Sequence, residues 1–492
     1  MPDPKTLAAA LLAAVTCSVP AAAAAEATLA LTPCRVEHPL KLTAIAAECG
    51  TLSVAENPAR PGGRRIALYV ARVPAINRRK QPDPLFILAG GPGMAATDFY
   101  AGVAAAFARI GRDRDIVLVD QRGTGRSNTL TCELDQDAML RASPEAIAAE
   151  TARCLDALAT RADVAFYTTS LAVQDLDRVR AALGYERVSL YGVSYGSRVA
   201  QHYVRRFPGR VRAVILDGVV PPQLILGPAM ALDAEHALES ILRRCARDAS
   251  CRGRFGDPAL AYRNLRAQLQ AKPVPVSLQH PTTGEPWTLS FTGMHLATVL
   301  RLASYASEQA ALLPLALHAA DRDHNFAPLA AQFAMVSDSL ENVLAYGMNA
   351  SVVCAEDVPF YDSITIDRAQ LERTYLGTLQ LDALRLICRT WPRGPMDEDL
   401  HAPLESAVPA LLLSGTDDPV TPPSYAEQAR HGFGDHHHLV LRDQGHGQLG
   451  APCVDRVMAA FIAAGTARGL DVSCTRAVKP MPFFTSLAGP AP

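Results

Sequence analysis

Between residues 51 and 220, short and mostly apolar runs alternate with longer stretches whose apolar positions recur at helical spacing. Short apolar runs bounded by turn residues are typical of strands buried on both faces of a sheet. The clearest helical stretch is 170–183, and Gly184 follows it as a stop signal. The clearest strand-like runs are 84–88, 115–119 and 187–193. This alternation predicts a mostly parallel sheet with helices on both faces.

The alternation resumes at about residues 402–470, but the segment between, at about 221–400, has a different pattern. It begins with Pro221-Pro222 and is mostly helical in periodicity, with a strand-like excursion at 276–293. It contains no internal repeat. We therefore expect a mainly helical insertion that forms a cap domain. Such caps restrict access to a site, exclude water and select substrates.

The run at 187–193 leads into Gly192-Val193-Ser194-Tyr195-Gly196, and the residues after Ser194 have a helical pattern. Gly-x-Ser-x-Gly between a strand and a helix is the nucleophile elbow of α/β-hydrolases, where a tight turn lifts the serine hydroxyl above the sheet. Glycines flank the serine because the neighbouring strand and helix leave no room for side chains. We therefore predict Ser194 as the nucleophile. The N–H of Tyr195, at the start of the helix, is a predicted oxyanion donor.

A serine nucleophile in this arrangement needs an acid and then a histidine later in the chain, and both are present. Asp417 and Asp418 follow the apolar run 409–413 in a turn rich in Gly and Pro. The spacing Gly-x-x-Asp-x-x-x-Pro favours Asp418, with Asp417 as a turn or capping residue. His446 lies between two glycines in a loop after a strand-like run. We expect His446 to be the general base that Asp418 orients.

A second glycine cluster, Gly90-Gly91-Pro92-Gly93, follows the run at 84–88. A loop of this kind can bring a backbone N–H close to the nucleophile and complete an oxyanion hole with Tyr195. Pro92 has no N–H, so Gly91 is the predicted second donor.

Four short motifs stand in order along the chain: Gly90-Gly91-Pro92-Gly93, Asp120-Gln121-Arg122-Gly123-Thr124-Gly125-Arg126-Ser127, Gly192-Val193-Ser194-Tyr195-Gly196-Ser197 and Leu216-Asp217-Gly218-Val219. Together they resemble the prolyl aminopeptidase family of serine peptidases, and within it the secreted tripeptidyl-aminopeptidase-like α/β-hydrolases of bacteria. The stretch Gly415 to Pro422 and the later Gly445-His446-Gly447 resemble the C-terminal segment of that branch. The resemblance covers roughly residues 40–475. It implies an α/β-hydrolase fold and a triad of Ser194, Asp418 and His446. One departure is Ala89, where many relatives have a histidine.

The N-terminus has the pattern of a secretory signal peptide. Lys5 precedes an apolar run at 7–19, and Ala23-Ala24-Ala25 is a small-residue cleavage site. The run is rich in Ala, which would make a weak membrane span, and no other segment approaches ~18 apolar residues. Cys17 would allow a lipoprotein anchor, but Thr16 is a poor residue before it. We therefore predict export to the periplasm or beyond. The expected segments are a signal peptide at 1–25, a first core part at 26–220, a cap at 221–400, and a second core part with a C-terminal tail at 401–492.

The composition fits a globular enzyme that is exported. Hydrophobic residues make up 49% of the chain and charged residues 20%, with a net charge of −2 and no basic patch, so we expect no nucleic-acid partner. No oligomeric state follows from the sequence. Of 11 cysteines, Cys17 falls in the predicted signal, and an oxidising compartment would pair the other ten. They fall in neighbouring couples, for which we predict sequential disulfides: Cys34 with Cys49, Cys132 with Cys154, Cys245 with Cys251, Cys354 with Cys388, and Cys453 with Cys474.

An aminopeptidase must also hold the free α-ammonium group of its peptide, and a partly buried carboxylate does this best. The candidates in the predicted cap are Asp233, Glu235 and Glu239 on one helical stretch, and Glu356 and Asp357 beside Cys354. We select Glu235, Glu356 and Asp357, the last two because a disulfide beside them would hold them rigid.

We therefore predict a secreted serine exopeptidase that acts on peptides and needs no metal or organic cofactor. His436-His437-His438 is a poor metal site, because neighbouring residues on a strand point to opposite faces. A carboxylesterase acting on small acyl esters would use the same triad, since the fold does not fix the substrate. A non-catalytic binding protein is a further alternative, and the complete catalytic set argues against it.

Overall fold

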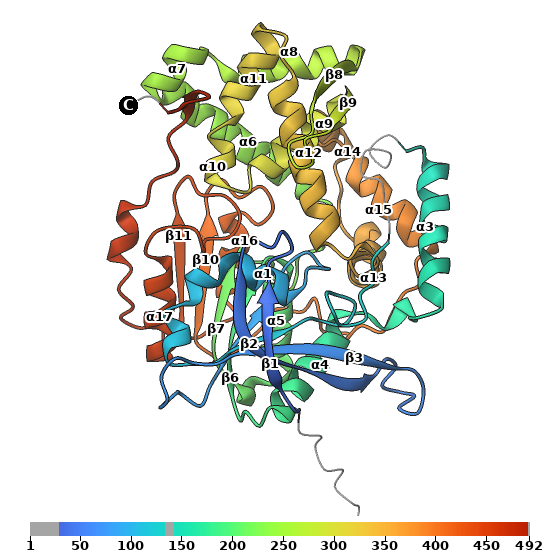
Figure 1. The fold of residues 1–492 in the computed structure, drawn as a ribbon, viewed down its shortest axis with the longest axis vertical. Helices are drawn as coiled ribbons and strands as arrows, with labels where there is room; N and C mark the ends of the chain where they lie inside the picture. Colours follow the sequence, from blue (N-terminus) through green and yellow to red (C-terminus); the bar gives the residue numbers. More distant parts are fainter. Residues whose placement is uncertain (1–28, 133–141, 491–492) are drawn as a thin grey trace, which may run out of the picture.

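The computed structural model describes residues 29–132 and 142–490, and the predicted signal peptide lies outside them. Within these residues, nine strands form one large sheet in the order β1-β2-β3-β5-β4-β6-β7-β10-β11 (Figure 1). The strands are β1 (Thr32–Glu37), β2 (Ala44–Ala55), β3 (Arg65–Val73), β4 (Leu85–Leu88), β5 (Ile116–Val119), β6 (Val188–Val193), β7 (Val211–Asp217), β10 (Ala410–Gly415) and β11 (His436–Leu441). The pairs β1–β2, β2–β3 and β3–β5 are antiparallel. The remaining neighbours in the sheet, β5–β4, β4–β6, β6–β7, β7–β10 and β10–β11, are parallel. The sequence prediction of a mostly parallel sheet is confirmed.

Helices cover both faces of this sheet, because alternate side chains of its central strands are buried on opposite sides. Phe86 and Leu88 of β4 belong to a hydrophobic cluster with one set of helices, whereas Leu85 and Ile87 belong to a second cluster. The first set includes α3 (Pro144–Ala159), α4 (Thr169–Ala182), α5 (Tyr195–Arg206) and α16 (Pro423–Arg430), and the second includes α1 (Ala96–Val103) and α17 (Val454–Ala464). The helix expected at 170–183 is α4. In the described part of the chain, no helix is both long enough and apolar enough to cross a membrane.

The segment between β7 and β10 forms most of the upper part of the molecule in Figure 1. Its elements are α6 (Met230–Arg247), α7 (Ala249–Phe255), α8 (Pro258–Ala271), the hairpin of β8 (Val274–Gln279) and β9 (Pro286–Phe291), α9 (Gly293–Ala303), α10 (Ser307–Ala310), α11 (Leu313–Arg322), α12 (Ala327–Val343), α13 (Tyr346–Glu356), α14 (Arg368–Arg373) and α15 (Leu379–Thr390). The hairpin matches the strand-like excursion expected around Trp287. Residues of α6, α8, α9, α11 and α12 share one hydrophobic cluster with this hairpin.

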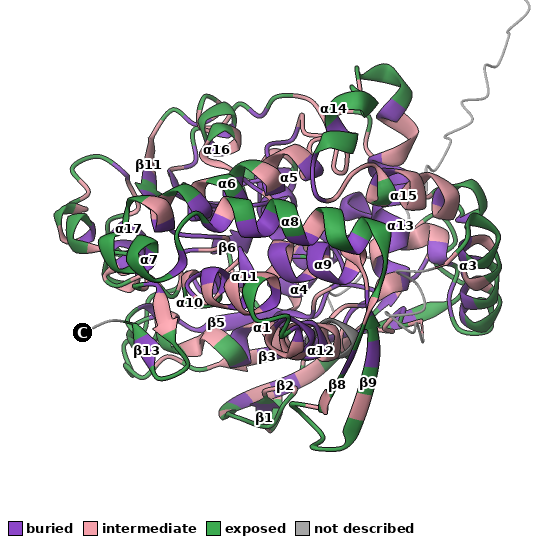
Figure 2. Ribbon diagram, turned by 90° about the horizontal axis from the view of Figure 1, so that it is seen from above, coloured by how far each residue is buried: buried purple, intermediate pink, exposed green. Residues whose placement is uncertain are grey.

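Two helices of the predicted cap belong instead to the core of the sheet. Met348 and Val352 of α13, with Cys388 of α15, lie in the same hydrophobic cluster as the side chains of β4 and β6. Most residues of α13 are buried, whereas Figure 2 shows the outer surface of α3 as exposed. The inserted segment therefore has an upper portion with its own core and a lower portion that is anchored on the sheet.

The described residues contain five disulfides, and they join the neighbouring cysteines that the sequence predicted. Two of them lie in the inserted segment: Cys245–Cys251 ties α6 to α7, and Cys354–Cys388 ties α13 to α15. The C-terminal tail crosses to the same segment. It ends in the strands β12 (Phe484–Ser486) and β13 (Gly489–Pro490), and Phe483 packs with Ile241 of α6. The chain thus fastens the insertion at several points.

Candidate functional site

The turn that carries Ser194 has the strand–turn–helix geometry expected from its sequence. Strand β6 ends at Val193, α5 begins at Tyr195, and Ser194 between them has φ 56° and ψ −128°. A positive φ is costly for a residue with a side chain and persists only where the surroundings enforce it. Here a side chain on Gly192 would overlap the Gly196 carbonyl, and one on Gly196 would overlap the Leu88 carbonyl. The two glycines therefore allow strand, turn and helix to pack closely enough to hold the serine in this conformation.

The glycine loop after β4 lies against this serine. A side chain on Gly90 would place its Cβ 2.9 Å from the Ser194 Cβ and 3.5 Å from its Oγ. Gly91 follows with φ +106°, a conformation that favours glycine. Tyr195 is the first residue of α5, where backbone N–H groups have no acceptor within the helix. The two predicted oxyanion donors, Gly91 and Tyr195, therefore belong to segments that border Ser194 directly.

His446 and Asp418 form a buried hydrogen-bonded pair. His446 Nδ1 lies 2.8 Å from Asp418 Oδ2, which leaves Nε2 as the nitrogen free to accept a proton. Asp418 also accepts hydrogen bonds from the backbone N–H groups of Val420 and Thr421 and from the Thr421 hydroxyl. Burial alone would raise the pKa of Asp418, but His446 and these donors hold it below its ordinary value. Burial alone would lower the pKa of His446, but the carboxylates of Asp418 and Asp217 raise it above its ordinary value.

Asp417, the neighbouring aspartate, faces a different part of the molecule. It accepts a hydrogen bond of 2.8 Å from the Ser240 hydroxyl and lies 4.0 Å from the Arg244 guanidinium, both on α6. The structure thus separates two adjacent carboxylates that the sequence could rank only by spacing. Asp418 is the one that contacts the histidine.

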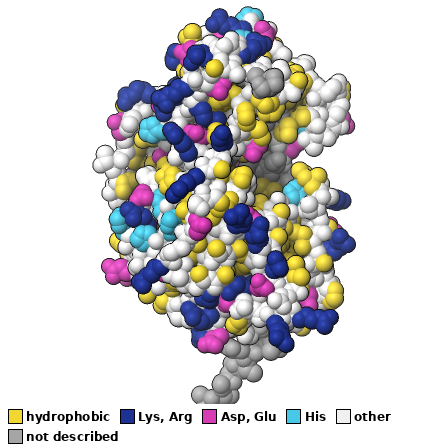
Figure 3. Space-filling view, turned by 90° about the vertical axis from the view of Figure 1, so that its left-hand side faces the viewer, with side chains coloured by type: hydrophobic (Ala, Val, Ile, Leu, Met, Phe, Trp, Pro, Cys, Tyr) yellow, Lys and Arg dark blue, Asp and Glu magenta, His cyan; other side chains and the backbone are white. Residues whose placement is uncertain are grey.

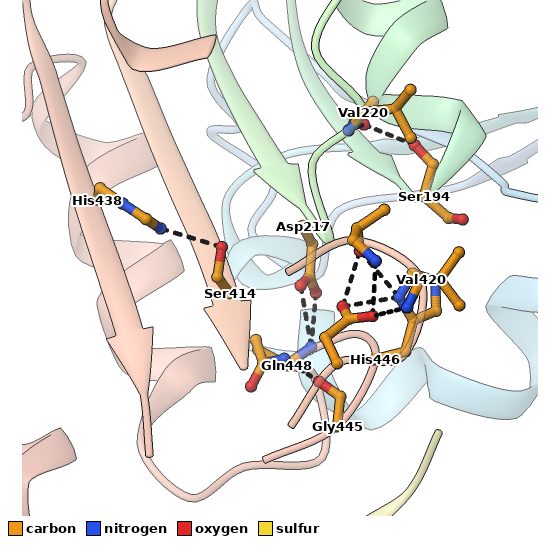
Figure 4. Close-up of polar contacts among 12 residues, drawn as sticks. Ser194, Asp217, Val220, Ser414, Val420, His438, Gly445, His446 and Gln448 are labelled. Carbon is orange, nitrogen blue, oxygen red and sulfur yellow. Dashed lines mark hydrogen bonds and ion pairs between the residues drawn. The ribbon is translucent and has the colours of Figure 1, made fainter. Parts of the chain in front are cut away.

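The dipeptide Asp217-Gly218, at the end of β7, lies against both the serine and the histidine. The Ser194 N–H donates a hydrogen bond of 2.9 Å to the Asp217 carbonyl. A side chain on Gly218 would place its Cβ 3.0 Å from His446 Cε1. Figure 4 shows Ser194, Asp217 and His446 in one view: Asp217 is the last residue of β7, and the other two lie in the segments that follow β6 and β11. Parallel strands end at the same edge of a sheet, which is why residues so distant in sequence meet here.

Residues of the inserted segment cover this edge of the sheet. The carbonyl of Tyr305, just after α9, accepts a hydrogen bond of 2.8 Å from the His446 N–H, and its ring packs edge-on against the imidazole at 5.0 Å. Asp233 of α6 accepts a hydrogen bond of 2.6 Å from Tyr425 on α16. Burial raises the pKa of Asp233 to about 6, and the nearby charge of Asp418 adds to that rise. Sequence reasoning gave no role to Tyr305 or Tyr425, because their contacts depend on how the insertion folds back.

The carboxylates of Glu356 and Asp357 lie fully buried beside the helix that begins at Tyr195. Glu356 accepts hydrogen bonds from the N–H and the hydroxyl of Thr169, and that hydroxyl lies 2.6 Å from the Tyr195 hydroxyl. Burial raises the pKa of Glu356 to about 7. Arg198 Nη1 donates to both carboxylate oxygens of Asp357, at 3.0 and 3.1 Å. Both side chains therefore tie α13 to the serine-bearing region of the core.

Glu235, the third predicted amine-binding carboxylate, is partly buried on α6. It accepts a hydrogen bond of 2.7 Å from the Tyr375 N–H. Burial raises the pKa of Glu235, and the Tyr375 donor partly offsets that effect. Glu235 is therefore less deeply buried than Glu356 and Asp357.

The run His436-His437-His438 begins β11, where successive side chains point to opposite faces of the sheet. His436 contacts the Phe433 carbonyl, and His438 contacts Glu427 and the Ser414 hydroxyl. In the part of the chain that the structure describes, no three His, Cys, Asp or Glu side chains gather as a metal site.

Two family models match the parts of the chain that contain the candidate site residues. A family model described as "alpha/beta hydrolase fold" matches residues 83–245, which include Ser194, and a model described as "TAP-like protein" matches residues 374–474, which include Asp418 and His446. The serine protease Hip1 of Mycobacterium tuberculosis is 29% identical over 481 residues, covering 90% of each chain. A tripeptidyl aminopeptidase of Streptomyces lividans is 26% identical over 478 residues, covering 88% of this chain and 85% of the relative.

A third relative matches a shorter part of the chain. It is named carboxylesterase B, of Mycobacterium tuberculosis, and is 33% identical over 193 residues, which cover 36% of each chain. The two full-length relatives, the two family models and the fold agree with one another. The chain has the α/β-hydrolase fold, and it is a serine hydrolase similar in sequence to a bacterial serine protease and a bacterial tripeptidyl aminopeptidase.

Proposed function

We propose that this serine hydrolase is a secreted exopeptidase that removes residues from the free N-terminus of peptides through an acyl-enzyme on Ser194. The observation that carries this proposal is the Asp418–His446 pair, 2.8 Å apart, at the sheet edge where Ser194 is held in a strained turn. Nε2 of His446 takes the proton of the Ser194 hydroxyl as its oxygen attacks the peptide carbonyl. The histidine then gives that proton to the leaving amine. Water repeats the sequence and releases the acyl unit.

In this proposal the oxyanion of each tetrahedral intermediate is held by the N–H groups of Gly91 and Tyr195. The support is geometric: the Gly90-Gly91 turn packs against Ser194, and Tyr195 opens α5. Backbone donors fixed before the reaction lower the barrier without reorganising during it. Buried behind them, the Glu356–Thr169–Tyr195 hydrogen bonds would keep the start of α5 in place.

For the carboxylate that binds the α-ammonium group, the contacts favour Asp233. Glu356 and Asp357 are fully buried, and their oxygens are already occupied by Thr169 and Arg198, so we assign them to support of the fold. Asp233 is partly exposed, belongs to the insertion above the sheet edge, and is close enough to Asp418 for that charge to raise its pKa. With a pKa of about 6, it is largely ionised at neutral pH and loses its charge below that value. Glu235 is the second choice.

A carboxylesterase is the second candidate function, because one relative with that name is 33% identical over 193 residues of this chain. The same serine, histidine and oxyanion donors would hydrolyse a small acyl ester. The difference between the two functions lies in the insertion, since only a peptidase that starts from a free N-terminus needs an anionic group for the amine.

Substrates that differ only at the N-terminus test the proposal. The mature protein should cleave aminoacyl or tripeptidyl amides with a free N-terminus and leave the acetylated compounds intact. The Asp233→Asn variant should lower kcat/KM for the free compounds by about 10- to 100-fold, because it removes a charge-assisted hydrogen bond. It should leave hydrolysis of a short acyl ester within about twofold.

The control for Asp233→Asn is Glu239→Gln on the same helix, since Glu239 is exposed and pairs only with Arg243 among the contacts of α6. This variant should behave as the wild type. Equal cleavage of free and acetylated amides would reject the exopeptidase, and hydrolysis of esters without any amide turnover would establish the carboxylesterase.

Export is supported by the signal-like N-terminus and by the five disulfides of the described chain. Disulfides persist in oxidising compartments and are rare in the cytosol of most bacteria. N-terminal sequencing of the protein recovered from a periplasmic or culture-fluid fraction should give Glu26 as the first residue. Recovery of the full-length chain from the cytosol alone would reject this part of the proposal.

A further inference from the structure

Asp217 is a fully buried carboxylate next to the proposed catalytic set, and the mechanism above leaves its side chain without a role. It lies at the carboxyl end of β7 and has no exposed surface. The N–H of Gln448 donates to both of its oxygens, at 3.0 and 2.9 Å, and the Tyr191 hydroxyl donates at 2.8 Å. Figure 4 shows these contacts from Asp217 to Gln448 beside His446. A buried carboxylate is costly unless its environment compensates it, so its position requires an explanation.

The loop that Asp217 contacts is the one that carries the histidine. Gln448 is two residues after His446, and its side chain folds back to donate a hydrogen bond of 2.9 Å to the Gly445 carbonyl. On the other side, the His446 N–H donates to the Tyr305 carbonyl. The loop is thus fixed before and after the imidazole by hydrogen bonds to two separate elements. Asp217 is the anionic acceptor of a backbone N–H in this loop, whereas Asp418 contacts the imidazole itself.

The backbone of the same residue also supports the serine, because the Asp217 carbonyl accepts the Ser194 N–H. One residue therefore binds the strained turn through its main chain and the histidine loop through its side chain. A displacement of about 1 Å between reacting groups can lower the rate about 100-fold. A residue that fixes both Ser194 and the His446 loop can therefore affect the rate without contacting the substrate.

We propose that Asp217 is a second carboxylate of this active site, a positioning residue that fixes the His446 loop against Ser194 and stabilises the charged imidazole together with Asp418. The inference rests on the proposed catalytic roles of Ser194 and His446. Asp418 orients the ring through Nδ1, whereas Asp217 acts through the backbone of Gln448 and through its charge. Asp217 is the last residue of β7, and Asp418 follows the neighbouring strand β10; the first contacts the Gln448 N–H and the second contacts His446 Nδ1.

The charges around the two groups define the expected pH dependence. Asp217 faces the Tyr191 hydroxyl from β6, His446 from its loop and Asp418 from the end of β10, and burial raises the pKa of Asp217 to about 6. His446 faces Asp418, Asp217 and, from α9, Arg301; of these, the two carboxylates raise its pKa and Arg301 lowers it. Replacing Asp217 with a neutral residue removes one of the charges that favour the imidazolium. The pKa of His446 should therefore fall.

The test compares pH–rate profiles of the wild type and Asp217→Asn on a tripeptidyl amide. Because the free enzyme needs a neutral His446, the acidic limb of kcat/KM reports its pKa and should move to lower pH in the variant. At the pH optimum, kcat should fall by about 10- to 100-fold with KM changed less than about twofold, since Asp217 is too deeply buried to contact a substrate. Asp217→Glu keeps the charge but moves the carboxylate, so it should lower kcat while leaving the acidic limb near its wild-type position.

Asp115→Asn is a matched control at the opposite end of the sheet. Asp115 precedes β5 and, like Asp217, accepts hydrogen bonds from a backbone N–H (Ala75) and a tyrosine hydroxyl (Tyr185); it differs in also forming an ion pair with Lys80. The Asp115→Asn variant should leave the acidic limb of kcat/KM and the value of kcat unchanged. If Asp217→Asn does not fold, the kcat of Asp217→Glu tests the proposal: a lowered kcat supports it, and a kcat equal to that of the wild type rejects it.

Two results separate this inference from the proposed function. A Ser194→Ala variant without activity, together with an Asp217→Asn variant whose kcat and acidic limb match the wild type, would reject the role of Asp217 alone. An active Ser194→Ala variant would reject the catalytic set and this inference with it.

Discussion

Ser194→Ala should lower kcat for an aminoacyl or tripeptidyl amide by about 10⁶-fold, the loss that removal of a serine nucleophile causes in peptidases with such a triad. The reason is that Ser194 is the residue in the strained turn after β6, with φ 56°, whose hydroxyl oxygen lies against the glycine loop. The measurement is steady-state hydrolysis by the mature protein; titration with an organophosphate, which reacts with a catalytic serine, should count the active fraction of the wild type and give no labelling of Ser194→Ala. The variant should fold normally, since alanine lacks only the hydroxyl oxygen.

Ser189→Ala is the matched control for this variant. Ser189 lies near the start of β6, the strand that leads to Ser194. Its buried hydroxyl donates a hydrogen bond to Asp83. It should keep kcat within about twofold of the wild type while losing some stability, since a buried hydrogen bond contributes roughly 1 kcal/mol. If Ser194→Ala retained more than about 1% of the activity, the acyl-enzyme mechanism would be wrong.

The parts of the site that the sequence predicts are those whose geometry is local. Gly192 and Gly196 specify a close turn whatever the rest of the chain does, and the structure shows that a side chain at either position would overlap backbone. The run before Asp418 and the run before His446 are strand ends, and parallel strands present their ends at one edge. The order of these features along the chain was therefore enough to predict that they converge.

The remaining parts of the site depend on contacts between distant segments, which no local pattern encodes. The sequence placed Glu356 and Asp357 beside a disulfide, but their partners Thr169 and Arg198 lie 187 and 159 residues away. Those partners bury both carboxylates and use their oxygens, which a sequence cannot show. Likewise, Asp217 follows an apolar run much as Asp418 does, yet its contact with Gln448 spans 231 residues.

The insertion illustrates the same limit at the level of domains. Its helical content and a strand-like excursion at 276–293 were visible as periodicity, whereas the attachment of α13 and α15 to the core was not. The face shown in Figure 3 has hydrophobic side chains beside a recess between the upper and lower parts of the molecule. Amphipathic helices of similar composition pack on the sheet or on one another, and only tertiary contacts distinguish the two outcomes.

Asp418→Asn should lower kcat by about 10⁴-fold, while Asp417→Asn, one residue away, should change kcat by less than about threefold. An amide at position 418 can still contact His446, but its NH₂ group can face Nδ1 and favour the tautomer in which Nε2 carries the proton and cannot act as a base. It also removes the charge that stabilises the imidazolium. Asp417 contacts Ser240 and Arg244 instead, so its loss should weaken the attachment of α6 and leave the chemistry intact.

The pH dependence separates the two aspartates independently of the rate. Because Asp418 raises the pKa of His446, Asp418→Asn should shift the acidic limb of kcat/KM to lower pH, and Asp417→Asn should leave it in place. Thermal denaturation followed by circular dichroism should give Asp417→Asn a lower Tm than the wild type, although its catalysis should be normal. Should Asp417→Asn instead be the variant that loses activity, the acid of this site would have been assigned to the wrong residue, and the 2.8 Å contact between Asp418 and His446 would need another explanation.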